Sequence, residues 1–441
     1  MKSSPEHHTV LIVGGGPAGL SLAVVLGGSH PYYRDGTMFN AAYSRIGELL
    51  RIHKDSLLKL DFAALSKAGI APVDLFRLLH HPSQQFSGLD EVSLDFRMNA
   101  PLDYLMLSRE PVGGIWNNAP DNLLTLSPGH WMELAFYPLA RYAQECGKTI
   151  DVDALIRKRD LIDYYHSIPE RFGQTDRIHT DEDVFSIRPH ERGFLVSSRS
   201  MTGGDERQYT ATYLVMATGQ RGTLRRLGVP GEDLPFVSNQ YRSPDQTPGS
   251  HIAVIGGGRS SDWAATELFD SGRKVTYIMR QTERHHWQLI DDSRQGLPYY
   301  ARLAHILESG DDRFKAFYGS RVRCIEEDGE QRRLIAGAAG EERTIDVDQV
   351  VVEIGGDVDY SILEGYPPLR TVEKFDPYRF QCNQIPIRPH SYESVDIPNL
   401  YPGGYLAEGI GLVVIAMHGT TYAIAADILA KEGLNSGVPL N

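Results

Sequence analysis

The chain has 441 residues, of which 41% are hydrophobic and 23% charged, and its formal net charge is −13. These ordinary proportions exclude a disordered or fibrous protein, and the acidic excess argues against a nucleic-acid or anionic-membrane binder, whose surface must be basic. The length predicts about three domain-sized units.

The first predicted element is a buried strand over Thr9–Val13, followed by a helix over Pro17–Leu26. The turn between them has the G-x-G-x-x-G pattern. Its first glycine permits the tight turn, its second lets a pyrophosphate approach the backbone, and its third lets helix and strand pack closely. Free N–H groups at the helix start favour the phosphates. The predicted cofactor contacts are Gly14, Gly16, Pro17, Ala18 and Gly19.

In such a unit, an acidic residue about 20 positions beyond the first glycine binds the adenosine ribose from a strand end. Asp35 lies near that spacing, but residues 27–34 contain proline and two glycines and do not read as a strand. We therefore expect the next strand at Leu102–Leu107, which makes residues 27–101 an insertion. Its apolar spacing indicates helices, which we expect to cover the cofactor or the substrate entrance.

A later strand, Tyr213–Gly219, ends in small residues and adds Thr218 and Gly219 to the cofactor contacts of the first unit. Residues 221–248 are punctuated by glycine and proline and are predicted to be a linker.

A second glycine turn follows the strand His251–Ile255 and precedes another helix. Ser261 takes the place of the third glycine and meets the same packing need with a small side chain. Arg280 ends the next strand, Lys274–Met279, where an arginine suits a ribose 2′-phosphate and an acid suits a free hydroxyl. This indicates NADPH, with a plain surface arginine as the alternative. The predicted contacts are Gly256, Gly258, Ser260, Ser261 and Arg280.

Two such turns indicate two different dinucleotides, by convention FAD in the first unit and NADPH in the second. The predicted fold is therefore α/β, with two Rossmann-like domains and a helical insertion in the first. We expect the FAD domain at residues 1–220 and 357–441, the linker at 221–248 and the NADPH domain at 249–356, which ends in the strand Gln349–Gly355.

The segment after Leu107 contains Gly113-Gly114-Ile115-Trp116, the G-G-x-W element of class B flavin monooxygenases. More specifically, the chain resembles the oxidative stress-induced growth inhibitor family over nearly its whole length. The segments that carry this resemblance are His30–Tyr33, Leu107–Trp116, Leu126–Met132 and Tyr164–Tyr165.

This resemblance implies an FAD- and NADPH-dependent monooxygenase that uses O₂ through a flavin 4a-hydroperoxide to hydroxylate a small organic molecule. Asn117 and Asn118 are the implied catalytic candidates, since an amide can donate to the peroxide or to a flavin carbonyl; the alternative is a solvated turn before Pro120. Trp116 and Trp131 have core packing as their alternative role. The implied flavin-side contacts are Ser108, Arg109, Gly113, Gly114, Ile115, Trp116, His130, Trp131 and Met132.

The chain departs from the class B pattern at several positions. Leu107 occupies the place of the ribose-binding glutamate, so that Ser108 or Arg109 is expected to act instead. The F-x-G-x-x-x-H fingerprint would start at Phe236, but Arg242 stands at its histidine, which favours hydroxylation of nitrogen, another soft heteroatom or carbon over Baeyer–Villiger chemistry. Near the C-terminus, Tyr405 replaces the common aspartate, before a helix expected at about 419–431.

Two alternatives stay open: an FAD-dependent NADPH oxidoreductase without oxygen insertion, and a regulatory protein that keeps the fold without turnover.

The three cysteines form no CxxC pair, which disfavours a disulfide reductase and points to the cytoplasm. No metal site is predicted, because the adjacent histidines of the 80–81 and 285–286 pairs point apart. No membrane span is expected. The expected partners are the substrate and O₂, and a homo-oligomer is left open.

Overall fold

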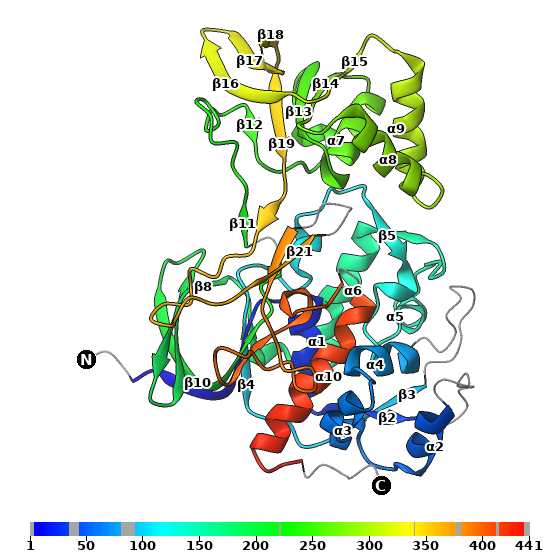
Figure 1. Ribbon diagram of the computed structural model, residues 1–441, viewed down its shortest axis with the longest axis vertical. Coiled ribbons are helices and arrows are strands. Elements are labelled where there is room, and N and C mark those ends of the chain that lie inside the picture. Colours follow the sequence, from blue (N-terminus) through cyan, green and yellow to red (C-terminus); the bar gives the residue numbers. More distant parts are fainter. Residues whose placement is uncertain are drawn as a thin grey trace.

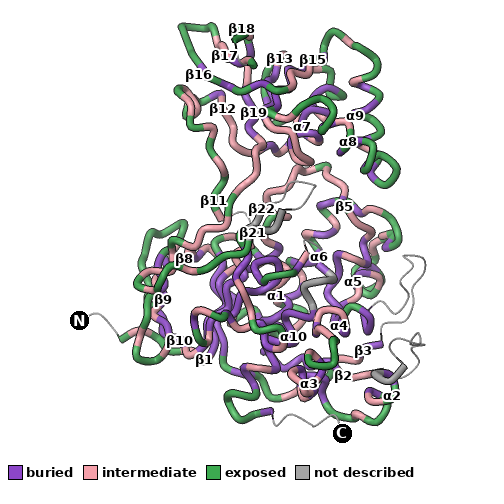
Figure 2. The backbone as a smooth tube through the Cα atoms, viewed as in Figure 1, coloured by how far each residue is buried: buried purple, intermediate pink, exposed green. Residues whose placement is uncertain are grey.

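The computed structural model describes residues 4–34, 44–80, 93–219, 222–338, 340–375, 381–411 and 414–435. Figure 1 shows two α/β units, a larger one built from both ends of the chain and a smaller one built from its middle. Buried backbone is concentrated in the sheet and helices at the centre of each unit (Figure 2).

The larger unit is organised by a seven-stranded sheet of order β7-β4-β1-β10-β9-β8, with β23 also paired to β10. Strands β4, β1, β10 and β23 run parallel, and their apolar residues are buried on both faces, as is typical of a parallel sheet covered on two sides. The strands are β1 (Glu6–Val13), β4 (Tyr104–Leu107), β7 (Ile178–His179), β8 (Glu182–His190), β9 (Gly193–Ser200), β10 (Glu206–Met216) and β23 (Leu400–Pro402).

Helix α1 (Pro17–Leu26) follows β1, as predicted, and packs against α10 (Val414–Lys431). The helix predicted over 419–431 therefore begins earlier, at Val414. Gly419 lies inside it, where α10 crosses α4 (Pro72–His80); a Cβ at Gly419 would lie only 2.1 Å from the Cα of Val73. Glycine thus permits a close approach of these two helices.

The segment 27–101 contains, among its described residues, three α-helices, a short 3-10 helix and a two-stranded ribbon. The interpretation of residues 27–34 as non-strand was wrong, because Ser29–Tyr33 forms β2 and pairs antiparallel with β3 (Leu94–Met98). Pro31 has no backbone N–H to donate. A strand of a two-stranded ribbon is hydrogen-bonded along one edge only, so it tolerates a proline that a central strand would not. The strand beside β1 is still β4, as predicted, with Val13 paired to Leu107. Asp35 lies outside the described residues. The remaining helices are α2 (Ser44–Ile52), η2 (Leu57–Lys59) and α3 (Phe62–Lys67).

The smaller unit has a parallel sheet of order β12-β19-β13-β14-β15. Helices lie on one side of it and a three-stranded antiparallel sheet on the other (Figure 1), with an apolar cluster on each face. Its elements are β12 (Val237–Ser238), β13 (His251–Gly256), α7 (Arg259–Asp270), β14 (Lys274–Ile278), α8 (Glu283–Ser293), α9 (Pro298–Ser309), β15 (Phe314–Phe317), β16 (Arg321–Asp328), β17 (Gln331–Ala338), β18 (Glu341–Asp346) and β19 (Gln349–Glu353).

The chain crosses between the units along β11 (Thr223–Leu224) and β20 (Gly356–Asp357), which pair antiparallel. The predicted linker 221–248 therefore contributes β11 to this crossing and β12 to the smaller sheet.

No helix among the described residues is long and apolar enough to cross a membrane. The other short elements are η3 (Gly114–Asn117), β5 (Leu124–Pro128), η4 (Gly129–Trp131), α5 (Leu139–Glu145), β6 (Leu155–Arg157), α6 (Lys158–Arg171), η5 (Thr175–Arg177), η6 (Pro244–Gln246), β21 (Val372–Phe375), β22 (Gln381–Gln384) and η7 (Gly404–Leu406).

Candidate functional site

The first glycine turn lies at the carboxyl edge of the larger sheet, the edge where ligands bind in parallel α/β folds. Gly14 has a left-handed φ of 112°, and a Cβ there would lie 2.4 Å from the carbonyl oxygen of Ala217. A Cβ at Gly19 would lie 2.0 Å from the carbonyl oxygen of Gly14. Neither position accepts a side chain, so the sequence pattern is enforced by close backbone contacts.

The G-G-x-W loop lies directly against this turn. The N–H of Gly113 donates to the carbonyl of Gly15 at 2.7 Å, and a Cβ at Gly114 would lie 2.9 Å from the Cα of Gly16. The nearest atom to a Cβ at Gly16 itself is the Gly114 Cα, at 3.9 Å. The structure thus brings together two groups of predicted contacts that are about 100 positions apart in the sequence, and it leaves a backbone cradle that side chains would fill.

Two hydroxyl groups line the same edge. The Oγ1 of Thr218 is buried and has no hydrogen-bond partner among the described residues. Ser108 is buried next to Gly15 and donates to the carbonyl of Glu110 at 2.7 Å. Leu107, at the position of the usual acid, is 1% exposed, whereas the predicted contact Arg109 is exposed to solvent. A buried hydroxyl without a partner is a group that a bound ligand can satisfy.

Asn117 and Asn118 use their side-chain amides within their own loop. The Asn117 amide donates to the carbonyl of Pro111 at 2.7 Å, and the Asn118 amide donates to Glu110 Oε1 at 2.7 Å. The Asn117 Oδ1 lies 3.0 Å from His166 Nε2. Both amides therefore stabilise the turn, and their catalytic contact with a flavin stays a prediction.

The predicted contacts at 130–132 lie against the core of the larger unit. His130 is 8% exposed and its Nδ1 lies 2.9 Å from the carbonyl of Val152. Met132 is buried, and its carbonyl accepts from the hydroxyl of Tyr165 at 2.6 Å, a phenol whose pKa is raised by burial. Trp131 and Trp116 are half-buried, and Trp116 packs against the same apolar core. Packing and hydrogen bonding fix this segment, and its contact with a flavin also stays a prediction.

The C-terminal loop after β23 is held by a buried glutamine that sequence reasoning missed. Gln384 is 1% exposed and donates to the carbonyls of Tyr405 and Ile410, at 2.7 and 2.9 Å. Tyr405, where an aspartate is common, is buried. Only the fold could reveal this role, because Gln384 is distant from any motif.

The second glycine turn is arranged around Ser261. Its Oγ accepts from the N–H groups of Gly257 and Gly258, at 2.8 and 3.0 Å. A Cβ at Gly256 would lie 2.5 Å from the Cβ of Ser261, so Gly256 has no room for a side chain beside the start of α7. A Cβ at Gly258 would meet no atom within 4 Å, so the backbone is open to a ligand at the start of α7.

Behind this turn lies a buried carboxylate that sequence reasoning missed, because no motif marks it. Asp262 is fully buried, and it accepts from the hydroxyls of Tyr277 and Tyr300, at 2.6 and 2.9 Å, and lies 2.8 Å from His286 Nε2. Burial and the adjacent carboxylate raise the pKa of Tyr277. These groups come from α7, β14, α8 and α9, so the network ties the start of α7 to its surroundings.

Arg280 lies just beyond β14, which pairs parallel with β13, and is exposed. The next residue, Gln281, lies against the glycine turn, since a Cβ at Gly257 would be 2.8 Å from its side chain. The structure therefore places Arg280 at the edge where the ribose of a dinucleotide is expected.

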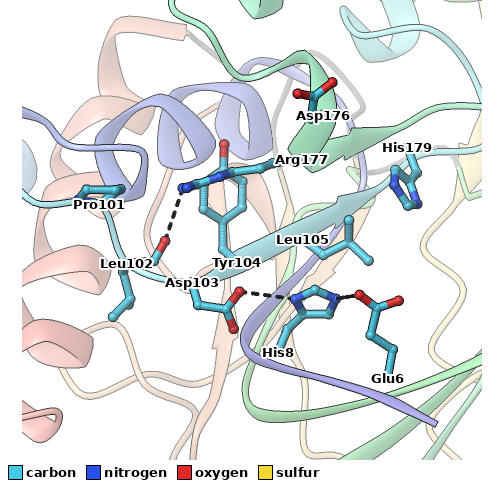
Figure 3. Close-up of a pocket in the computed structure, with 10 residues that line it drawn as sticks. All are labelled: Glu6, His8, Pro101, Leu102, Asp103, Tyr104, Leu105, Asp176, Arg177 and His179. Carbon is cyan, nitrogen blue, oxygen red and sulfur yellow. Dashed lines mark hydrogen bonds and ion pairs between the residues drawn. The ribbon is translucent and has the colours of Figure 1, made fainter.

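A hollow of about 330 Å³ lies at the opposite, amino-terminal edge of the larger sheet, and Figure 3 shows the residues that line it. His8 lies there between Asp103 and Glu6, at 3.2 and 3.3 Å, and Arg177 donates to the carbonyl of Leu102. No glycine turn or helix N-terminus of the two candidate sites reaches this edge, so we do not assign the hollow to a dinucleotide. Among the described residues, no group of three or more His, Cys, Asp or Glu side chains is arranged to hold a metal ion.

Comparison with known proteins identifies the chain's relatives. The family model described as pyridine nucleotide-disulphide oxidoreductase matches residues 92–404. Human oxidative stress-induced growth inhibitor 1 is 25% identical, over 98% of this chain and 97% of its own length.

Among solved structures, bacillithiol disulfide reductase from Bacillus cereus has a TM-score of 0.65 at 20% identity and covers 97% of this chain and 100% of its own. The Kutzneria sp. 744 ornithine N-hydroxylase, with reduced FAD, NADP⁺ and L-ornithine, has a TM-score of 0.62 at 17% identity, over 97% of this chain and 100% of its own. At these identities the likeness shows the fold alone, that of FAD- and NAD(P)-binding oxidoreductases and class B monooxygenases.

Proposed function

Because this chain belongs to the pyridine nucleotide-disulphide oxidoreductase family and, within it, to the oxidative stress-induced growth inhibitor family, we propose that it is an FAD- and NADPH-dependent monooxygenase. Its substrate would be a small organic molecule, hydroxylated on nitrogen, another soft heteroatom or carbon, with O₂ as co-substrate. We expect it to act in the cytoplasm.

The observation that carries this proposal is the backbone cradle formed by the two glycine segments of the larger unit. Gly16 and Gly114 face each other without side chains, and the hydroxyl of Thr218, a residue that lies against Gly14 of the same turn, has no described partner. Pyrophosphate requires such a close approach to N–H groups at a helix start. These residues therefore fit FAD, with the ribose left to Ser108 or Arg109 because Leu107 is apolar.

The residues of the smaller unit fit NADPH in the same way. Gly258 is open at the start of α7, and Ser261 fixes the N–H groups of the turn. Arg280 is free of burial and carries the positive charge that a 2′-phosphate requires. When bound, the two cofactors would supply hydride transfer and oxygen chemistry, while this chain binds, orients and desolvates them.

An NADPH oxidoreductase without oxygen insertion is the second candidate, favoured by the disulfide reductases of the same fold. The described cysteine side chains do not support a thiol relay. Cys146 is exposed at the end of α5, and Cys324 lies on β16 of the smaller unit, so neither is part of a glycine turn. A regulatory protein without turnover is the third candidate, suggested by the name of the human relative.

The test is to purify the chain with excess FAD, remove unbound flavin and measure the molar ratio of FAD to protein. NADPH oxidation, O₂ uptake and hydrogen peroxide are then followed with candidate amines, amino acids and aromatic metabolites. Substrate-dependent NADPH use with a product 16 mass units heavier, the mass of one added oxygen atom, supports the proposal. Peroxide release with no oxygenated product from any substrate supports the second candidate, and a colourless, inactive protein supports the third.

A further inference from the structure

The two units meet at a polar contact next to the G-G-x-W loop. Arg242, which follows β12 of the smaller unit, donates to the carbonyl of Asn117 at 2.7 Å and to Asp121 Oδ1 at 3.2 Å. The N–H of Asp121 donates in return to the carbonyl of Arg242 at 2.9 Å. Both the side chain and the backbone of Arg242 therefore bond to the turn 117–121 of the larger unit.

Neighbouring residues extend this contact toward the second glycine turn. Gln240 donates to the carbonyl of Asn118 at 3.1 Å, and Asn122 donates to Glu267 Oε1 at 2.7 Å. Glu267 lies on α7, the helix that begins at the second glycine turn, and its other oxygen accepts from Tyr241. The contact thus joins the loop of one candidate cofactor site to the helix of the other.

The chain crossing provides the second connection between the units. There β11 pairs with β20, and the guanidinium of Arg225 binds the carboxylate of Asp357 at 2.6 to 3.1 Å. A crossing of two short strands fixes one point but permits rotation about it. A guanidinium bonded to several acceptors at a second point removes that freedom, because its donors have a fixed planar geometry.

We propose that Arg242 is a positioning residue that holds the smaller unit in register with the turn 117–121, and so sets the path for hydride transfer between the two cofactors. This inference rests on the proposed function. When bound, the two cofactors would supply this transfer: one hydride, which is one proton with two electrons, would pass from NADPH to the flavin and leave NADP⁺, and a proton from solvent would complete the reduced flavin. Arg242 contacts no reacting atom, so its loss affects the transfer rate rather than the affinity for either cofactor.

The experiment compares Arg242→Ala, Arg242→Lys and the control Arg226→Ala. Among the described residues, the half-exposed Arg226 forms its ion pairs with Glu232 and Asp233, in the segment after β11. Hydrogen exchange of residues 113–122 is measured in the FAD-loaded protein without NADPH, and flavin reduction is followed at saturating NADPH. We expect Arg242→Ala to raise exchange in this loop and to slow limiting reduction at least tenfold, with FAD content and the Kd for NADPH within twofold. Lysine recovers part of the rate, because an ammonium still pairs with Asp121, and the control behaves as wild type.

Each outcome decides between the two proposals. If NADPH does not reduce wild-type flavin, the proposed function fails, while loop exchange still tests the contact of Arg242. If wild type is reduced and Arg242→Ala has the same limiting rate, or if only its affinity for NADPH falls, the inference is wrong. If Arg242→Ala does not fold, Asp121→Ala removes the partner from the other side and is judged by the same measurements.

Discussion

The buried carboxylate of Asp262 allows a quantitative test of how the second candidate site is built. Asp262→Ala would remove the acceptor of the Tyr300 hydroxyl and of the His286 ring nitrogen, and would leave the Tyr277 hydroxyl with the Oγ of Ser261 at 2.9 Å. Each buried donor without a partner costs about 1–3 kcal/mol. Removing one partner of a buried charged network costs about 3–5 kcal/mol once the surroundings relax. We therefore expect Asp262→Ala to lower the free energy of unfolding of the smaller unit by about 3–5 kcal/mol.

The assay is urea unfolding followed by the fluorescence of Trp263 and Trp287, which pack against the core of the smaller unit. Asp262→Asn keeps one acceptor oxygen, and its amide can donate to a tyrosine oxygen, so we expect less than half of the alanine effect. The matched control is Asp270→Ala on the same helix. Asp270 is 40% exposed and pairs with Arg302, so this change should cost less than about 1 kcal/mol.

The same two variants also test NADPH binding. Because Asp262 lies in the first turn of α7, its loss should also weaken NADPH binding, whereas Asp270→Ala should not. If Asp262→Ala unfolds within about 1 kcal/mol of the Asp270→Ala variant, the carboxylate is not the acceptor that these donors require, and the reasoning is refuted.

Three further predictions concern the cofactors and the pH dependence of stability. Gly114→Ala should lower FAD affinity at least tenfold, since its Cβ would lie 2.9 Å from the Cα of Gly16. The control Gly147→Ala, at a similar φ of 62° but with no atom within 4 Å, should retain FAD. Equal FAD content in both variants would contradict the proposal that the backbone cradle binds FAD. Arg280→Ala should raise the Kd for NADPH about 10- to 100-fold in titrations, because a hydrogen bond to a charged group contributes about 1.5–3 kcal/mol. The Kd for NADH should stay unchanged. An equal rise of both Kd values would show that Arg280 does not bind the 2′-phosphate. Burial, with a smaller effect of a nearby lysine, lowers the pKa of His30 from 6.5 to about 4, so the unfolded chain binds a proton that the folded chain does not. Stability should therefore fall as pH drops from about 6.5 to about 4, by at most about 1.4 kcal/mol per pH unit for one proton, and His30→Gln should reduce the slope of urea midpoints measured across this range. Part of the slope should remain, because burial also lowers the pKa of His80, to about 3.

The glycine turns and the strands and helices around them could be predicted from the sequence, because their causes are local. A strand, a glycine at a left-handed φ and a helix start require residue types at fixed spacing, so β1, α1, β13 and α7 lie at or near their predicted places. The prediction that Leu102–Leu107 supplies the next strand of the sheet was also correct, since β4 pairs parallel with β1. An interrupted apolar pattern excludes Ser29–Tyr33 from this central position. That segment still forms a ribbon strand, which an edge position permits despite its proline.

Only the tertiary structure decided which distant groups meet. Asp262 gains its donors from three other elements, Gln384 binds the carbonyl of Tyr405, 21 positions later, and Arg242 bonds to a turn more than 100 positions earlier. Asp262 and Gln384 lie outside the motifs, and the motif position of Arg242 does not reveal its contact, since a polar side chain is constrained by partners that the fold supplies. Sequence alone determines the conformations that a short segment can adopt, whereas the long-range partners of a polar group are set by how those segments pack.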